Sequence, residues 1–143
     1  MARKSLVIRL AGESGEGVIS SGDILTQAAG RGGYWTQTFR TYPAEIKGGP
    51  CMYQVRMGRD RIYSHGKDVD LLVCFNQEAW DLHWDALAPD GYILYDTTVE
   101  IPEEYKSRAR EVRMEELAKD IGGSSRAKNM VAVGAVCGVI EFD

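Results

Sequence analysis

The sequence predicts an α/β fold, a layered sandwich around a mostly parallel sheet with an antiparallel hairpin. Short β-favouring runs alternate with helical patterns along the chain, and one of these runs, residues 71–75 (LLVCF), is continuously apolar, as is typical of a central strand covered on both faces. The 143 residues can bury enough surface for one core. Since no repeat or linker divides the chain, we expect a single domain over residues 1–143.

The first expected strand covers residues 5–11 (SLVIRLA) and runs directly into the glycine loop, Gly12-Glu-Ser-Gly-Glu-Gly17. Small and apolar residues then recur at helical spacing from residue 18 to about residue 30, where further glycines end the pattern. The small size of this stripe predicts a helix that lies close to the sheet.

Two further strands are expected before the central one. Residues 34–42 (YWTQTFRTY) are rich in aromatic and β-branched side chains and stop at Pro43. Residues 51–57 alternate as in a half-exposed antiparallel strand, with Gln54 and Arg56 on the exposed face. The turn at residues 58–60 predicts a hairpin between this strand and residues 61–64.

The second half of the chain continues the alternation. Asn76 is a plausible N-cap for a helix over residues 77–87, and strands are expected at 92–95 and near 111–113. A helix near residues 115–121 and a last helix, capped by Ser125 and running through the apolar segment 130–140, complete the domain. In that last helix Gly134 and Gly138 indicate close helix packing in the core, and the charge run 100–113 is expected to be solvated surface.

Composition excludes several classes of protein. With 44% hydrophobic and 27% charged residues, the chain is neither disordered nor fibrous, and its longest apolar run is about half of what a membrane span needs. A formal net charge of −4 disfavours nucleic-acid binding. No export signal is visible, so we expect a cytoplasmic protein. Cys51, Cys74 and Cys137 form no CxxC pair, which predicts buried, reduced cysteines and no metal site.

The glycine loop is the first candidate binding site. Backbone N–H groups at a helix N-terminus suit a phosphate or a carboxylate. The glycines are spaced GxxGxG, which differs from both the dinucleotide fingerprint and the P-loop, and Glu13 and Glu16 add negative charge where a phosphate would sit. The alternative is that the glycines only permit a tight turn, and the sequence leaves both interpretations open.

The second candidate is the segment Tyr42-Pro-Ala-Glu-Ile-Lys-Gly-Gly49, preceded by Arg40, which follows a strand and combines an acid, two bases and flexible backbone. Other polar or aromatic residues carry less weight. His65 is expected in an exposed turn and His83 in packing. Trp80 and Trp84 share one helical stripe and could form core or a subunit contact.

Taken in order, these motifs resemble the gamma domain of 2-oxoacid:ferredoxin oxidoreductases. The glycine loop, the Ala28-Ala29 pair, the segment with Pro-Ala-Glu-Ile-Lys, Asp70-Leu-Leu-Val-Cys-Phe-Asn-Gln-Glu78 and Lys128-Asn-Met-Val-Ala-Val-Gly134 carry the resemblance. It covers nearly the whole chain. The form with Pro-Ala-Glu-Ile-Lys looks most like the 2-oxoglutarate-type enzymes, in which the gamma domain is fused ahead of the alpha domain.

The resemblance implies part of an enzyme that decarboxylates a 2-oxoacid such as 2-oxoglutarate to acyl-CoA and CO2 and reduces ferredoxin. This chain has neither paired cysteines nor a Gly-Asp-Gly motif, so thiamine diphosphate, Mg2+ and 4Fe–4S clusters are expected in the alpha and beta partner parts, and the chain is not catalytic alone. The gamma domain is implied to handle CoA, a co-substrate, and to support assembly. Its candidate contacts here are Gly12, Ser14, Gly15, Glu16, Gly17, Arg40 and Lys47.

The resemblance also implies that the chain is truncated at its C-terminal end, because chains of the family continue past the last helix. Two other classes of function stay open. One is a free-standing α/β module that binds a diphosphate nucleotide, such as NAD or ADP, through the glycine loop, although the GxGxxG spacing is missing. The other is a non-catalytic interaction domain without a small ligand.

Overall fold

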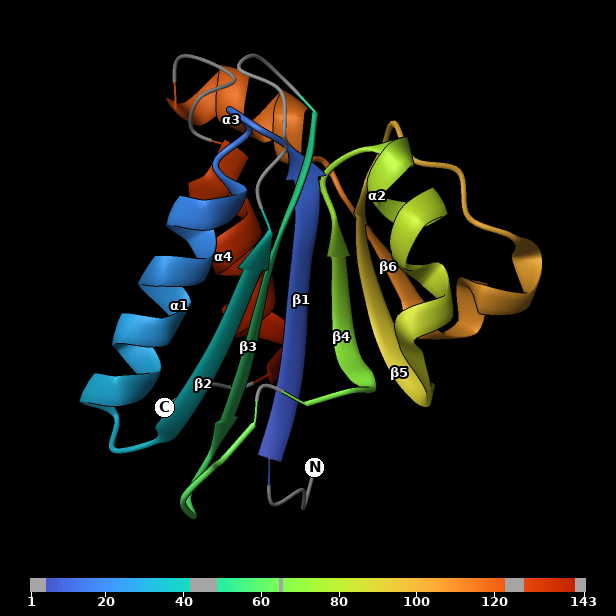
Figure 1. Cartoon of the computed structure of the whole chain (residues 1–143). Coiled ribbons are helices and arrows are strands. Elements are labelled where there is room, and N and C mark those ends of the chain that lie inside the picture. Colours follow the sequence, from blue (N-terminus) through green and yellow to red (C-terminus); the bar gives the residue numbers. More distant parts are fainter. Residues whose placement is uncertain (1–4, 42–48, 65, 123–127, 141–143) are drawn as a thin grey trace.

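A computed structural model of the chain describes residues 5–41, 49–64, 66–122 and 128–140. Its centre is a six-stranded sheet in the order β2-β3-β1-β4-β5-β6 (Figure 1). The strands are β1 (Ser5–Glu13), β2 (Trp35–Thr41), β3 (Pro50–Gly58), β4 (Val69–Cys74), β5 (Leu87–Asp96) and β6 (Ala109–Val112). Only β3 runs against the others, since it pairs antiparallel with β1 and β2 while the remaining pairs are parallel. The predicted fold class is confirmed.

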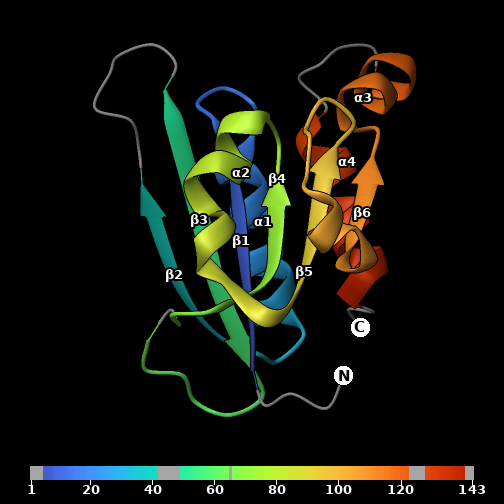
Figure 2. The ribbon, with the colours of Figure 1, turned by 90° about the vertical axis from the view of Figure 1, so that its right-hand side faces the viewer.

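Helices cover both faces of the sheet (Figures 1 and 2). On one face, α1 (Val18–Arg31) and α4 (Lys128–Ile140) pack on alternate residues of the strands, and α3 (Met114–Gly122) contacts α4. On the other face lie α2 (Gln77–His83) and the 3-10 helices η1 (Trp84–Ala86) and η2 (Glu103–Arg108). Each face therefore has its own apolar core.

The close approach of α1 to the sheet, expected from its small residues, is confirmed. Gly22 lies directly over the ring of Tyr53 on β3, where an added Cβ would come within 2.2 Å of the ring carbon Cγ. The Tyr53 hydroxyl meets Thr26 of α1 at 3.0 Å. Any side chain at position 22 would lift the helix off the sheet.

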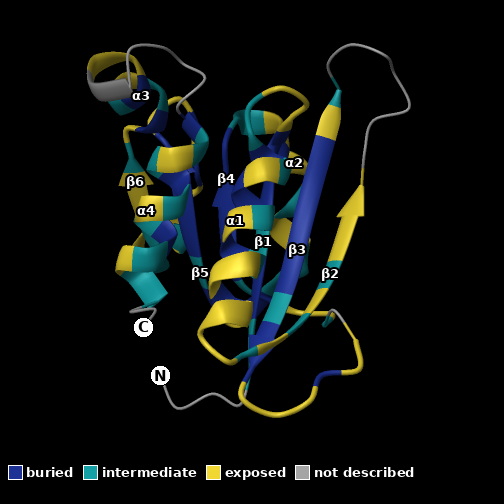
Figure 3. Ribbon diagram, turned by 90° about the vertical axis from the view of Figure 1, so that its left-hand side faces the viewer, coloured by how far each residue is buried: buried dark blue, intermediate teal, exposed yellow. Residues whose placement is uncertain are grey.

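The predicted hairpin partner of β3 is wrong. The described residues between β3 and β4 form no strand, and the antiparallel neighbours of β3 are β2 and β1, with Val55 opposite both Thr38 and Ile8. Because neighbours flank β3 on both edges, this strand is central, and Figure 3 shows it buried beside the exposed β2.

The expected half-exposure of β3 is also wrong at Gln54. This side chain is 1% exposed because its amide finds partners on both sides: Nε2 donates to the carbonyl of Gly66 at 2.9 Å, and Oε1 accepts from Nε of Arg9 at 2.8 Å. Sequence alternation marks the polar position but does not show that other segments supply partners for it.

The expected close packing at Gly134 and Gly138 is not observed among the described residues. No atom lies within 4 Å of the place where a Cβ would stand at either glycine, and both are exposed. The buried side of α4 is instead formed by Lys128, Ala132 and Val136. The Gly-x-x-x-Gly stripe therefore faces outward.

The cap of α2, the tryptophans and the cysteines can be compared with the expectations from the sequence. Asn76 caps α2 by accepting from the N–H of Ala79 at 2.9 Å, as predicted, although the α-helix ends at His83. Trp80 is 5% exposed and belongs to the core, whereas Trp84 is 47% exposed. Cys51 and Cys74 are buried and free, as expected, and Cys137 is half-buried. Residues 103–113 are mainly exposed. His65 and Ser125 lie outside the described residues.

Candidate functional site

The glycine loop lies at the carboxyl ends of β1 and β4, where the fold changes direction. The helix that follows β1 covers one face of the sheet, and the helix that follows β4 covers the other. In open α/β sheets, ligands bind in the crevice at such a point. The position of the glycine loop is therefore the expected one for a binding site.

Local backbone conformation explains why glycines occupy the loop. Gly15 and Gly17 have φ values of 98° and 87°, in the left-handed region that other residues rarely adopt. Gly17 is also the N-cap of α1, and a Cβ there would lie 2.6 Å from Cβ of Asn129 on α4. The loop is closed by hydrogen bonds from Ser14 N to Gly49 O at 2.9 Å and from Glu16 N to Glu13 O at 3.0 Å.

A cavity of about 270 Å³ opens between the loop and the first turn of α1, lined by Ser14, Gly15, Gly17, Val18, Ile19, Ser20 and Cys51. It is slightly smaller than a pocket for a whole drug-sized ligand, so it fits a phosphate-sized part of a larger molecule. The first turn of α1 carries no acidic residue, and because the N–H groups of a first turn have no partner within their helix, they give this end a partial positive charge.

Cys51 supplies the thiol of the cavity. Burial raises the pKa of this thiol, and the nearby carboxylates of Glu16 and Glu13 raise it further. The side chain is therefore a neutral thiol at neutral pH, which does not repel an anion in the cavity and is a poor nucleophile.

The predicted site residues differ in where the structure places them. Ser14, Gly15 and Gly17 line the cavity. Gly12 lies one residue before the end of β1, where a Cβ would meet Cβ of Phe75 at 2.8 Å, so it permits close packing rather than facing the cavity. Arg40 lies on β2, with Nη2 3.4 Å from Asp23 and its guanidinium 5.0 Å from the ring centre of Tyr53. Lys47 lies outside the described residues.

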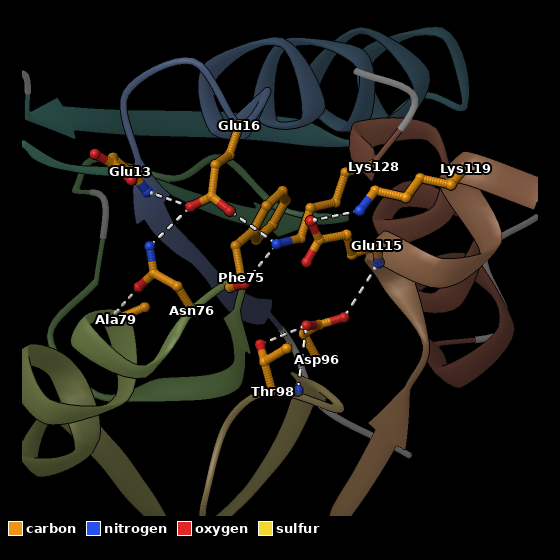
Figure 4. Close-up of polar contacts among 10 residues, drawn as sticks. All are labelled: Glu13, Glu16, Phe75, Asn76, Ala79, Asp96, Thr98, Glu115, Lys119 and Lys128. Carbon is orange, nitrogen blue, oxygen red and sulfur yellow. Dashed lines mark hydrogen bonds and ion pairs between the residues drawn. The ribbon is translucent and has the colours of Figure 1, made fainter. Parts of the chain in front are cut away.

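Glu16 does not line the cavity, because its carboxylate turns inward (Figure 4). Its Oε1 accepts from the backbone N–H of Glu13 at 2.7 Å and from Nδ2 of Asn76 at 2.8 Å. Its Oε2 pairs with Nζ of Lys128 at 2.8 Å. The negative charge of Glu16 is therefore balanced by a lysine that lies 112 residues further along the chain, whereas Glu13, the other acidic residue of the loop, is exposed.

Sequence reasoning missed Lys128 and Asn76 as partners of the loop. The sequence indicates Asn76 only as the cap of α2. In the structure its Oδ1 caps this helix while its Nδ2 donates to Glu16. A signal for Lys128 was present: it is the one charged residue of α4, at the start of an otherwise apolar helix. A lone charge on an apolar helix predicts a buried partner, but not which one.

Asp96 forms a second polar centre at the same edge of the sheet. Its side chain is buried, with Oδ2 2.6 Å from Oγ1 of Thr98 and Oδ1 accepting from the N–H of Glu115 at 3.2 Å (Figure 4). Burial alone would raise the pKa of Asp96, but these hydrogen bonds and the charge of Lys128 outweigh it and lower the pKa. The ionised carboxylate ties the end of β5 to the start of α3.

His83 lies on the opposite face of the sheet from the cavity and has a structural partner. Its Nδ1 is 3.1 Å from Nη1 of Arg9. Burial, together with the charge of Arg9, lowers the pKa of His83 to about 4, and Asp85 opposes this only in part. The neutral ring accepts from the guanidinium, in agreement with the packing role expected from the sequence.

The cysteines do not fit an iron–sulfur cluster. Cys51 belongs to the core on the α1 face and Cys74 to the core on the α2 face, so their side chains lie on opposite sides of the sheet. Within the described ranges, no group of three His, Cys, Asp or Glu side chains is arranged to hold a metal ion. None of the helices described is long and apolar enough to cross a membrane.

Comparison with known proteins places this geometry in a family. The sequence matches the family model described as pyruvate ferredoxin/flavodoxin oxidoreductase over residues 7–143. The ketoisovalerate oxidoreductase subunit VorA of Methanothermobacter thermautotrophicus is 35% identical over 130 residues, which are 90% of this chain and 27% of VorA. The 2-oxoglutarate synthase subunit KorC of the same organism is 32% identical over 139 residues, covering 90% of this chain and 73% of KorC.

Solved structures agree with this result. The 2-oxoglutarate:ferredoxin oxidoreductase from Magnetococcus marinus, solved with 2-oxoglutarate, coenzyme A and succinyl-CoA bound, is 42% identical with a TM-score of 0.85, covering 94% of this chain and 24% of that chain. The pyruvate oxidoreductase subunit PORC from Thermotoga maritima shares the fold, with a TM-score of 0.76 at 22% identity, covering 99% of this chain and 79% of PORC. The chain thus spans about a quarter of VorA and of the Magnetococcus chain. It belongs to the pyruvate ferredoxin/flavodoxin oxidoreductase family.

Proposed function

We propose that this chain is the gamma domain of a cytoplasmic 2-oxoacid:ferredoxin oxidoreductase, where it handles CoA and supports assembly with the alpha and beta parts. The whole enzyme would convert a 2-oxoacid such as 2-oxoglutarate, with CoA, to acyl-CoA and CO2 and reduce ferredoxin. Thiamine diphosphate, Mg2+ and the iron–sulfur clusters belong, in this proposal, to the partner parts. The chain itself contributes binding and orientation, not the bond-breaking steps.

The observation that carries the proposal is the cavity between the glycine loop and the N-terminus of α1. CoA is an anion whose phosphates suit backbone N–H donors and the positive end of a helix. The carboxylate of Glu16 is paired with Lys128 and does not face the cavity. The size of the cavity suits one end of CoA, leaving the thiol free to reach a reaction centre in another part of the enzyme.

The site residues divide into contacts and supports in this proposal. Gly15 and Gly17 contact a phosphate through their backbone N–H groups and Ser14 through its hydroxyl, because the N–H of Ser14 already donates to Gly49, while Gly12 and Glu16 hold the loop in place. Arg40 and Lys47 supply positive charge, since Arg40 precedes the segment 42–49 in the sequence and Lys47 belongs to it.

Reconstitution tests the proposal. The chain is produced together with matching alpha and beta parts, and the products are separated by size exclusion and assayed for CoA-dependent oxidation of 2-oxoglutarate with ferredoxin. We expect the three parts to co-elute and turnover to depend on the presence of this chain. The proposal is rejected when the chain neither associates with the partners nor alters their CoA-dependent turnover.

Replacement of Lys47 tests the site within the assembled enzyme. Lys47→Ala removes one phosphate contact, and we expect the KM for CoA to rise by about tenfold, as for a lost charged hydrogen bond, with the KM for the oxoacid unchanged. Lys67→Ala is the matched control, because Lys67 is exposed just before β4, at the opposite edge of the sheet from the glycine loop. Equal changes in both Michaelis constants would reject a CoA-specific role for Lys47.

A free-standing nucleotide-binding module is the second candidate, since N–H donors at a helix N-terminus do not distinguish one diphosphate from another. Calorimetric titration of the chain with NAD, ADP and CoA separates the two. A Kd for CoA below the values for NAD and ADP supports the oxidoreductase role, whereas binding of NAD or ADP at least as tight as that of CoA supports the module. Three flat titrations with retained partner binding would indicate an interaction domain.

A further inference from the structure

Lys128 is a buried cation with two partners at the carboxyl edge of the sheet. Its side chain is 7% exposed. Nζ donates to Oε2 of Glu16 at 2.8 Å and to the carbonyl of Phe75, directly after β4, at 2.7 Å (Figure 4). A charge is costly to bury unless it is paired and hydrogen-bonded, and both conditions are met here. Lys128 thus joins α4 to the glycine loop and to the end of β4.

Gly15, at the tip of the glycine loop, has no side chain that could fix it by packing. Around Gly15, no atom of the described residues lies within 4 Å of the place where a Cβ would stand, and glycine has more backbone freedom than any other residue. Gly15 is therefore not held by packing, and backbone hydrogen bonds from Ser14 to Gly49 and from Glu16 to Glu13 close the loop on either side of it. The bonds of the Glu16 carboxylate to Glu13, Asn76 and Lys128 anchor the loop from the opposite side.

The pair also determines the charge beside the cavity. An unpaired carboxylate at position 16 would place a negative charge one residue before the N-cap of α1, where it would oppose an anionic ligand. Lys128 balances that charge at 2.8 Å without occupying the cavity, because it is not among the lining residues. The loop can therefore contain Glu16 and still accept an anion.

We infer that Glu16 and Lys128 form a positioning pair, which holds the backbone donors of the glycine loop in the orientation that receives an anionic group of CoA. The inference rests on the proposed CoA-handling function. The pair touches no ligand itself. Its effect is on the geometry of Ser14, Gly15 and Gly17, and it should therefore alter CoA binding while leaving the oxoacid site in the other parts of the enzyme unaffected.

Three variants of the reconstituted enzyme test the pair. Lys128→Met removes the charge and keeps most of the volume, and Glu16→Gln keeps an oxygen for Glu13 and Asn76. We expect Lys128→Met to raise the KM for CoA by about tenfold, with kcat and the KM for 2-oxoglutarate within about twofold of the parent. Lys128→Met combined with Glu16→Gln should fall closer to the parent than Lys128→Met alone, since the carboxylate that had lost its lysine partner is then removed as well.

Lys119→Met is the matched control. Lys119 forms an ion pair with Glu115 at 3.4 Å, but the side chains are 60% and 42% exposed, so the same substitution there removes only a surface interaction. We expect both Michaelis constants to be unchanged in this variant. The inference is overturned when Lys128→Met and Glu16→Gln each raise the KM for CoA and the KM for 2-oxoglutarate by the same factor. It is also overturned when neither variant raises the KM for CoA.

Amide hydrogen exchange of the loop gives a readout that does not need activity. Exchange of residues 13–17 should be at least about tenfold faster in Glu16→Gln or Lys128→Met than in the parent or in Lys119→Met. Unchanged exchange in both variants refutes the positioning role, whether or not the enzyme is active. A parent complex without CoA-dependent turnover refutes the proposed function instead. Glu16→Gln keeps the test decisive when Lys128→Met does not fold.

Discussion

At the scale of single residues, the burial of His83, together with its contact to Arg9, makes stability depend on pH below neutrality. The folded protein holds the pKa of His83 at about 4, whereas the unfolded chain has a value near 6.5. Between these values the unfolded state binds a proton that the folded state does not. The free energy of unfolding contributed by His83 is therefore fully present above about pH 6.5 and is lost as the pH falls toward about 4.

His83→Gln tests this dependence. Glutamine offers an acceptor to the Arg9 guanidinium but does not titrate, so the loss of stability between about pH 7 and about pH 5 should be smaller in the variant than in the parent. Urea denaturation at the two pH values measures the difference. Equal losses in parent and variant would show that His83 is not held neutral by its surroundings.

At the scale of elements, two helical glycines should respond to alanine in opposite directions. At Gly134 of α4, no atom of the described residues lies within 4 Å of the place where a Cβ would stand. Gly134→Ala should therefore raise the free energy of unfolding by about 0.5–1 kcal/mol, because alanine lowers the entropy of the unfolded chain. Gly22→Ala should lower it by about 1–3 kcal/mol, because the new Cβ overlaps the buried ring of Tyr53. Denaturant titration of both variants measures the two changes in the free energy of unfolding. Changes of the same sign would contradict the different surroundings of Gly22 and Gly134.

The elements also show what the sequence can predict. Local signals located β1, the turn at Gly12–Gly17, α1 and the cap at Asn76, because glycines, apolar spacing and capping residues act within a few positions of one another. The order of the strands in the sheet cannot be predicted from such local signals. A strand with two neighbours and a strand at an edge can carry the same alternating pattern, so β3 gave no sign that β2 and β1 both pair with it.

The site shows the same limit. The glycine loop was found from its spacing, but the partners of Glu16 lie 60 and 112 residues away, on α2 and α4. No local rule links these positions, since the carboxyl edge of the sheet assembles them only when the strands align. The sequence therefore predicts that Glu16 repels a phosphate, and the fold shows that Lys128 balances the charge of its carboxylate.

At the scale of the whole molecule, the sheet joins two apolar cores into one cooperative unit. Neighbouring residues of β1 point to opposite faces, with Leu10 in the α1 core and Ala11 in the α2 core, and β4 and β5 do the same. Because the same strands carry both cores, loss of packing on one face removes support from the other. The binding loop connects β1 to α1 and so depends on both.

This arrangement predicts that damage to either face unfolds the whole domain. Leu72 belongs to the α2 core and Leu94 to the α1 core, and both are at most 1% exposed. Leu72→Ala and Leu94→Ala should each lower the free energy of unfolding by about 2–5 kcal/mol. Tryptophan fluorescence, to which Trp80 of the α2 core contributes, and far-ultraviolet circular dichroism should give coincident denaturation curves in both variants. A Leu94→Ala variant that loses helical signal before its fluorescence changes would show that the two faces unfold separately.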